Sequence, residues 1–94
     1  MSHIDIVRKH TLSHEQARKA AEDVAAHLNE RFNLNYRWEG DSLHFKRSGV
    51  DGRLDITELE VRVRAQLGLL MLAMRPLLEE QINRYLDKIF ETRN

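Results

Sequence analysis

Residues 67–90 read LGLLMLAMRPLLEEQINRYLDKIF and form the most apolar part of the 94-residue chain. The apolar residues recur every three or four positions, which is the period of an α-helix. They are Leu70, Met74, Leu78, Ile82, Tyr85 and Ile89. A second row widens the apolar stripe and consists of Leu69, Leu72, Leu77, Leu86 and Phe90. This pattern predicts a C-terminal helix about 33 Å long, enough to cross a small sheet.

Pro76 lies inside this helical pattern and removes one backbone donor. In one interpretation the helix starts near Leu69 and bends at Pro76. In the other, Leu69–Arg75 is an extended turn and the regular helix starts at Pro76, where proline suits the first position. Because the apolar spacing continues through Pro76, we expect one helix with a bend.

A first helix is predicted from Ser13 to about Arg31. Ser13 and Gln16 have the spacing of a capping box, in which each side chain bonds the other residue's backbone N–H. Leu12 is placed to pack on Ala17 as a hydrophobic staple. The apolar stripe of this helix is rich in alanine, so the helix can approach its neighbour closely. The stripe comprises Ala17, Ala20, Ala21, Val24, Ala25, Leu28 and Phe32.

Alternating apolar and polar residues predict strands on both sides of the first helix. One strand covers residues 3–9. After the helix, a hairpin turns at Gly40-Asp41, and a short strand and a long, cleanly alternating strand follow. The apolar positions of these four strands are Tyr36 and Trp38, Leu43 and Phe45, Leu54 and Ile56, and Leu59, Val61, Val63, Ala65 and Leu67. The predicted order is therefore β-α-β-β-β-β-α.

The connections between these elements are short, so consecutive strands should pair in antiparallel fashion. Each strand has one apolar face, and each helix has one apolar stripe. We therefore predict an α+β fold in which two helices cover one face of an antiparallel sheet of four to five strands. The predicted organisation is a single domain over residues 1–94.

Composition excludes several classes of function. Fifteen Lys and Arg balance fifteen Asp and Glu, whereas general nucleic-acid binders carry a basic excess. Cysteine is absent, so there are no disulfides and no thiolate chemistry, which fits a reducing cytosol. The N-terminus lacks a signal-peptide pattern. The longest apolar run, Leu69–Met74, is far shorter than the ~20 residues of a membrane span. We expect a cytoplasmic protein without nucleic-acid partners.

The predicted open face of the sheet carries basic residues that could form a nucleic-acid stripe. They are Arg37, Arg53, Arg62 and Arg64. Acidic residues interrupt this stripe, namely Glu39, Asp55, Glu58 and Glu60. Opposite charges on neighbouring strands are ordinary cross-strand pairs, so we expect these residues to stabilise the sheet.

No pattern in the chain predicts catalysis, a metal site or a cofactor. The five histidines lack the spacing of a closed zinc site, and we expect them to be solvated. Glu58 and Glu60 stand two apart, which would suit acid–base chemistry on one strand face, but we favour ordinary cross-strand pairing with the arginines of that face. We expect a non-enzymatic protein with no catalytic residues, no metal and no cofactor.

The segment Leu69–Leu78 is more apolar than a helix on a sheet requires. One interpretation is a deeply buried helix start beneath the first helix. The other is an exposed patch for a homodimer, a partner protein or an apolar particle surface, and the residues leave both open. The candidate contact residues are Leu69, Met71, Leu72 and Leu77.

Several short features, in their order and spacing, make the chain resemble the polyhydroxyalkanoic acid system proteins of bacteria. They are Lys9-His10-Thr11-Leu12-Ser13, Trp38-Glu39-Gly40-Asp41, Phe45 followed by Gly49-Val50-Asp51-Gly52, and Leu67-Gly68 leading to Pro76. Members of this family are encoded beside genes for polyhydroxyalkanoate storage polyester. The resemblance implies an accessory role at the granule surface or with a granule-associated protein, and it supplies no catalytic residues.

The order of strands and helices also resembles a reduced helix-grip fold of the START-like lipid binders. That resemblance implies an alternative function, in which an acyl or hydroxyacid ligand binds between the sheet and the C-terminal helix. Trp38 and Phe45 would line such a site. The chain is short for a deep cavity, so this likeness concerns the fold more than the ligand.

Overall fold

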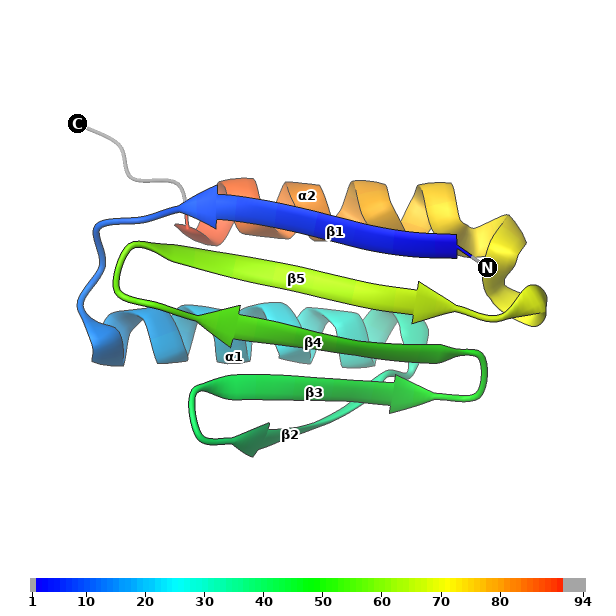
Figure 1. Cartoon of the computed structure of the whole chain (residues 1–94), viewed down its shortest axis with the longest axis horizontal. Coiled ribbons are helices and arrows are strands. Elements are labelled where there is room, and N and C mark those ends of the chain that lie inside the picture. Colours follow the sequence, from blue (N-terminus) through cyan, green and yellow to red (C-terminus); the bar gives the residue numbers. More distant parts are fainter. Residues whose placement is uncertain (1, 91–94) are drawn as a thin grey trace.

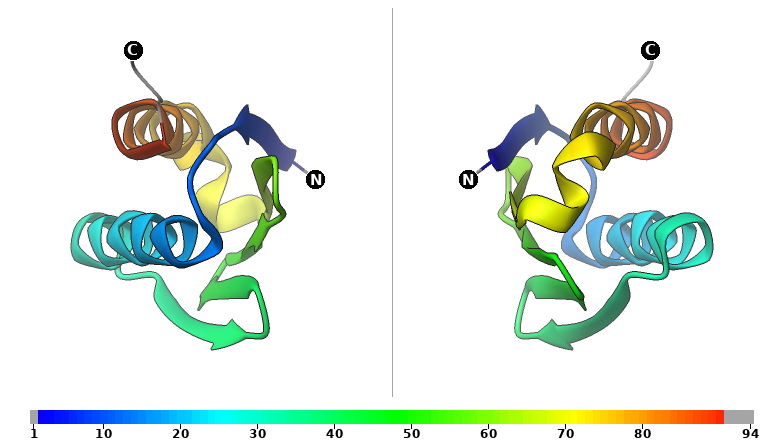
Figure 2. Two further views of the ribbon diagram at one scale, coloured as in Figure 1. Left: turned by 90° about the vertical axis from the view of Figure 1, so that its left-hand side faces the viewer. Right: turned by 90° about the vertical axis from the view of Figure 1, so that its right-hand side faces the viewer.

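The computed structural model describes residues 2–90 and shows a five-stranded antiparallel sheet with its helices on one face (Figures 1 and 2). The strands are β1 (Ser2–Lys9), β2 (Asn35–Glu39), β3 (Ser42–Arg47), β4 (Val50–Ile56) and β5 (Glu60–Leu67). The helices are α1 (His14–Phe32), a 3-10 helix η1 (Leu69–Met74) and α2 (Arg75–Phe90). The predicted α+β fold and the order β-α-β-β-β-β-α are confirmed.

The strands lie in the order β1-β5-β4-β3-β2. From β2 to β5 each strand pairs with the next along the chain, as the short turns predict. β1 joins the far edge, where Ile4 lies opposite Ala65 and Ile6 lies opposite Val63. Since β1 and β2 are the two edge strands, α1 carries the chain across the sheet from one edge to the other (Figure 1).

The core lies between the sheet and the helices (Figure 2). Successive side chains of a strand point to opposite faces, so the apolar positions of the strands turn toward the helices. The buried strand residues are Ile4, Ile6, Leu43, Phe45, Val50, Leu54, Ile56, Val61, Val63 and Leu67. The helices contribute the alanine-rich stripe of α1 and, from α2, Leu78, Ile82 and Leu86. The side chains predicted to continue this stripe at Ile89 and Phe90 lie outside the described part of the chain.

Both ends of α1 are capped. The Gln16 N–H donates to Ser13 Oγ at 3.1 Å, and the Ser13 N–H donates to Gln16 Oε1 at 3.1 Å. This confirms the predicted capping box. At the other end, Asn33 adopts the left-handed conformation with φ 58°, and its N–H donates to the Asn29 carbonyl at 2.9 Å. Asparagine tolerates this conformation better than most residues, which ends the helix before β2.

The prediction of one bent helix through Pro76 is wrong. Leu69–Met74 is a 3-10 helix, and α2 begins at Arg75. The Arg75 N–H donates to the Leu72 carbonyl, a bond of three-residue spacing. Pro76 cannot continue an α-helical ladder from upstream because it has no N–H, whereas in the first turn of α2 that N–H is not needed. η1 therefore runs at an angle to α2 (Figure 2).

The turn between β3 and β4 closes against η1. Gly49 has φ 87°, a conformation that costs little only for glycine. A Cβ at this position would lie 2.7 Å from Met71 Cγ. The Gly49 carbonyl also accepts the Gly68 N–H at 2.9 Å. Glycine is therefore required here both for the backbone conformation and for the approach of Met71.

Gly49→Ala is expected to lower the free energy of unfolding by about 1–2 kcal/mol, because it combines left-handed strain with a clash against Met71. Urea denaturation measures the change. Gly40→Ala is the matched control, since Gly40 has φ 62° but no atom within 4 Å of an added Cβ. An equal loss in both variants would show that the Met71 contact contributes nothing.

Candidate functional site

Exposed leucines gather at one end of the molecule, where β5 ends and α2 begins. Leu69 and Leu70 are 88% and 84% exposed, and Leu72 and Leu77 are 36% and 41% exposed. We refer to these four residues as the apolar tip. Large exposed apolar patches mark contacts with proteins or apolar surfaces, so this end is the candidate functional site.

The period of η1 explains why the leucines are exposed. In a 3-10 helix, residues three apart lie on the same side. Met71 and Met74 therefore share the side that faces the core, where Met71 is buried and Met74 is half-buried. Leu69 and Leu72 share a second side, and Leu70 shares the third with Ala73. Because all six residues of η1 are apolar, two of its three sides present apolar side chains to solvent.

The backbone of the apolar tip is held from two directions. On one side are the contacts of Gly68 and Met71 with the β3–β4 turn. On the other side, the Arg75 guanidinium donates to the His3 carbonyl at 3.1 Å and pairs with Glu79 at 3.6 Å. The exposed leucines therefore project from an anchored segment, which lowers the entropy lost when they bind.

The four candidate contact residues differ in their exposure to solvent. Leu69, Leu72 and Leu77 are exposed, whereas Met71 lies in the core at 8% exposure. Leu70 belongs to the exposed set and was missing from the candidates. An α-helical period placed Leu70 on the buried stripe. Pro76, two residues after the end of η1, was the signal that this period stops.

Trp38 and Phe45 occupy different environments. The Trp38 Nε1–H donates to Glu22 at 2.6 Å, and the Arg18 guanidinium lies 3.9 Å from the centre of the indole ring. Burial, together with a hydrogen bond to Glu22, raises the pKa of the neighbouring Tyr36. Phe45 is buried. These contacts fasten β2 to α1, so Trp38 has a structural role at this edge of the sheet.

The space between the sheet and the helices is small. A void bounded by Phe45, Gly52, Leu78 and Ile82, among others, has a volume of about 10 Å³. This is about the room one water molecule needs. Trp38 does not line it. A ligand held between the sheet and α2 would require the core side chains to move apart.

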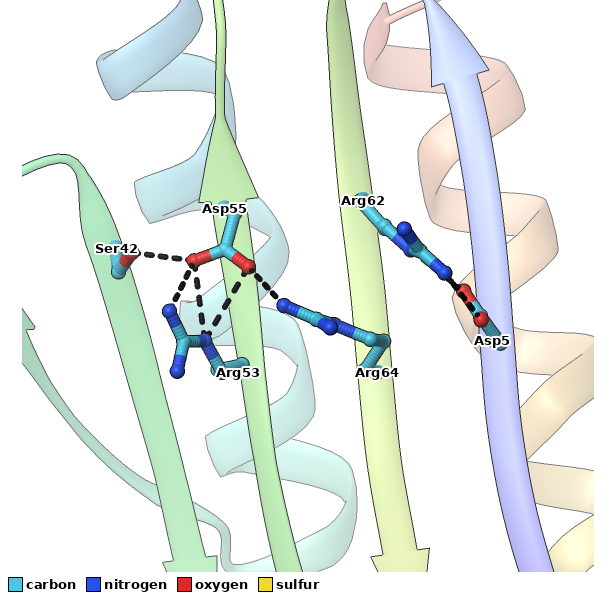
Figure 3. A network of polar contacts seen from close by, with 6 residues as sticks. All are labelled: Asp5, Ser42, Arg53, Asp55, Arg62 and Arg64. Carbon is cyan, nitrogen blue, oxygen red and sulfur yellow. Dashed lines mark hydrogen bonds and ion pairs between the residues drawn. The ribbon is translucent and has the colours of Figure 1, made fainter.

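The outer face of the sheet is a network of ion pairs (Figure 3). Arg62 binds Asp5 through two hydrogen bonds of 3.0 and 2.7 Å. Asp55 accepts hydrogen bonds from Ser42, Arg53 and Arg64. Acidic and basic residues are therefore matched across the strands, as the sequence predicted for this face.

The carboxylates of this network are held in their ionised form. The hydrogen bonds from Arg62 lower the pKa of Asp5. For Asp55, burial alone would raise the pKa, but the bonds from Ser42, Arg53 and Arg64 together outweigh it, and the pKa is lowered. Groups of this kind are poor proton acceptors at neutral pH.

The prediction of solvated histidines is wrong for His10, which is 3% exposed. The Leu12 N–H donates to His10 Nδ1 at 3.0 Å, and Nε2 lies 3.1 Å from the Thr57 carbonyl. Since a carbonyl only accepts, Nε2 carries the proton. His10 therefore fastens the start of α1 to the β4–β5 turn. Within residues 2–90, no group of three or more His, Asp or Glu side chains is placed to hold a metal ion.

Glu58 and Glu60 do not share a strand face. β5 begins at Glu60, and Glu58 lies in the preceding turn. In that turn, the Glu60 N–H donates to Thr57 Oγ1 at 3.2 Å, and Thr57 Oγ1 donates to the Glu60 carbonyl at 3.0 Å. The geometry predicted for acid–base chemistry is therefore absent from this pair.

Comparison with known proteins gives one match. The model of a family described as "Putative polyhydroxyalkanoic acid system protein" matches residues 4–90, which is nearly the whole chain. The chain belongs to this family. Neither the curated proteins nor the solved structures include a match.

The family match begins at Ile4, within β1, and includes α1, β2 to β5, η1 and α2. A polyhydroxyalkanoic acid system protein with this structure presents the four leucines of the apolar tip at one end and ion pairs on its open sheet face (Figure 3). No helix in the described part of the chain combines the length and apolar composition that crossing a bilayer requires.

Proposed function

We propose that the protein is a non-enzymatic accessory protein of the polyhydroxyalkanoate storage system, and that it binds the apolar granule surface through the apolar tip. This places it at granules in the cytoplasm. The exposure of Leu69 and Leu70 is the observation that carries the proposal. Membership of the polyhydroxyalkanoic acid system family supports the choice of surface.

The size of the expected effect follows from burial. Transfer of one leucine side chain out of water contributes about 1.5–3 kcal/mol. Leu69 and Leu70 are 88% and 84% exposed, so together they would contribute about 3–5 kcal/mol on a polyester surface. That corresponds to a partition factor of about 10²–10⁴. Two leucines alone give weak attachment, and Leu72 and Leu77 would add to it.

The chemistry of the outer sheet face supports a role without catalysis. Asp5 and Asp55 are bound by arginines that lower their pKa values. General bases and acids usually have pKa values near the working pH. These two carboxylates would serve the stability of the sheet.

Co-sedimentation of the purified protein with native granules, at low and at high salt, tests the proposal. We expect binding that persists at high salt, because apolar contacts are not screened by ions, whereas exposed ion pairs are. Binding that disappears at high salt would assign the contact to charge. Absence of binding at either salt would contradict the granule-surface proposal.

A further inference from the structure

The two edges of the sheet differ in how their backbone is protected. An edge strand carries a row of unpaired N–H and C=O groups, to which another strand can add. On β1, the His3 carbonyl accepts hydrogen bonds from Arg75, and the Val7 carbonyl accepts one from Arg8. Arg8 also binds Asp87 of α2. These arginines, together with α2, therefore protect the β1 edge.

The edge formed by β2 is open. Within residues 2–90, β3 is the only strand paired with β2, and no helix lies beyond this edge (Figure 1). The turn between β2 and β3 has two residues, so Glu39 and Ser42 form a hydrogen-bonded pair, as does every second pair after them. The backbone N–H and C=O of Arg37 therefore point toward β3. Those of Tyr36 and Trp38 point away from the sheet, where another strand can reach them.

The outer side chains of β2 carry one charge of each sign. Arg37 and Glu39 pair at 2.8 Å, and their side chains are 75% and 50% exposed. Because the pair is neutral, it does not select a partner of high net charge. It favours a strand that places a carboxylate opposite Arg37 and a cation opposite Glu39, since opposite charges across two strands stabilise a sheet. A second copy of β2 meets both conditions.

We propose that two copies of the chain pair through their β2 edges and join their sheets. The two strands run antiparallel about a twofold axis at Trp38, where each Trp38 N–H donates to the carbonyl of the partner's Trp38. In this register Arg37 lies opposite the partner's Glu39, and Glu39 lies opposite the partner's Arg37. A guanidinium has five N–H donors, so Arg37 can bind both carboxylates. A twofold axis at Arg37 would place the two arginines opposite each other, which destabilises a sheet.

The inner face of this edge also suits a second copy. The Trp38 ring is half-buried, with the Arg18 guanidinium 3.9 Å from its centre and Glu22 accepting its Nε1–H. The proposed register brings two indole rings side by side, and aromatic cross-strand pairs stabilise sheets. Tyr36 lies opposite the partner's Gly40. Gly40 has no side chain, and no atom lies within 4 Å of the Cβ position at this residue, so the tyrosine has room.

The contact is small, since each copy contributes a strand of five residues. Interfaces below about 1,200 Å² belong to weak or transient complexes, so we expect a dimer that forms in concentrated solution. The apolar tip lies at one end of the sheet, away from the β2 edge (Figure 1), and the proposal does not rest on the granule contact. Antiparallel pairing would turn the apolar tips of the two copies toward opposite ends of the dimer.

Sedimentation velocity of the full chain between about 10 μM and 1 mM tests the proposal, since weak dimers dissociate in this range. We expect the sedimenting mass to rise from one copy toward two. Over the same range, the backbone N–H of Trp38 should become protected from hydrogen exchange. The N–H of Arg37 should not change, because it already bonds β3. New protection confined to Leu69–Leu72 would assign self-association to the apolar tip and overturn the proposal.

Charge exchange tests the register. Arg37→Glu and Glu39→Arg should each weaken the dimer about tenfold, because like charges then lie opposite each other in two symmetric pairs. An equimolar mixture of the two variants should restore dimerisation, since an acidic strand then faces a basic one. Arg84→Glu on α2 is the matched control and should leave the dimer unchanged; Arg84 is 66% exposed and pairs with Glu80. A wild-type chain that stays monomeric at the highest concentration, a mixture that stays monomeric, or equal weakening by Arg84→Glu would overturn the proposal.

Discussion

Replacing Leu69 and Leu70 together by aspartate is expected to reduce granule binding by about 100-fold or more. The double variant removes the two most exposed leucines of the apolar tip. It also brings two carboxylates to the apolar surface, where each loses hydration without gaining a partner. Co-sedimentation at high salt is the measurement, because charge contacts then contribute little.

The fold should tolerate this double replacement, since substitutions of exposed side chains usually change the free energy of unfolding by less than about 0.5 kcal/mol. Leu59→Asp is the matched control. Leu59 is 70% exposed, but it lies in the β4–β5 turn, at the opposite end of the sheet (Figure 1). We expect its granule binding to equal that of the wild type. Loss of binding in both proteins, or in neither, would show that the tip is not the contact.

Asp55→Asn is expected to lower the free energy of unfolding at pH 7 by about 2–3 kcal/mol. The Asp55 side chain is only 20% exposed and accepts hydrogen bonds from three side chains, two of them arginines. Without its charge, Arg53 and Arg64 would face each other with no counterion between them. Urea denaturation measures the loss. Asp51→Asn, on the same strand and exposed, should change stability much less.

The stability difference between the wild type and Asp55→Asn should depend on pH. The pKa of Asp55 in the folded protein lies below its ordinary value of 3.8. Its stabilisation is therefore complete above the pKa of the unfolded chain and is lost as the pH falls through the lower folded-state pKa. The gap in stability between the wild type and Asp55→Asn should narrow below about pH 4. A gap that stays constant down to the acid transition would contradict this account.

Features that depend on neighbouring residues were predictable from the sequence. The Ser13–Gln16 capping box needs only a three-residue spacing, and the structure confirms it. The alternation in Val61 and Val63 likewise identified β5 and its buried face. Such patterns work because a strand or helix repeats its geometry every few residues.

Features that depend on distant residues were not predictable in this way. Nothing near β1 indicates that it pairs with β5 rather than with β2. His10 appeared to be a surface residue because its partner, the Thr57 carbonyl, lies 47 positions along the chain. Both contacts exist only once the sheet has assembled.

The apolar tip combines features that depend on neighbouring residues with features that depend on distant ones. Its excess of apolar residues was visible in the sequence, and so was Pro76. The buried side of η1 depends on how closely Met71 approaches Gly49, which no local pattern contains. The sequence therefore indicated where the surface lies, while the division between Leu70 and Met71 required the structure.

The pairing of the first strand with the last also constrains synthesis. β1 leaves the ribosome before its partner β5, which ends at Leu67, 58 residues after Lys9. At about 5–20 residues per second, β1 waits roughly 3–12 s for that partner. During this interval Ile4 and Ile6 have no sheet to join, while the β2–β5 meander can form only after α1 has been made. The sheet is thus completed only after β5 has been made, and β1 is the segment that most needs protection until then.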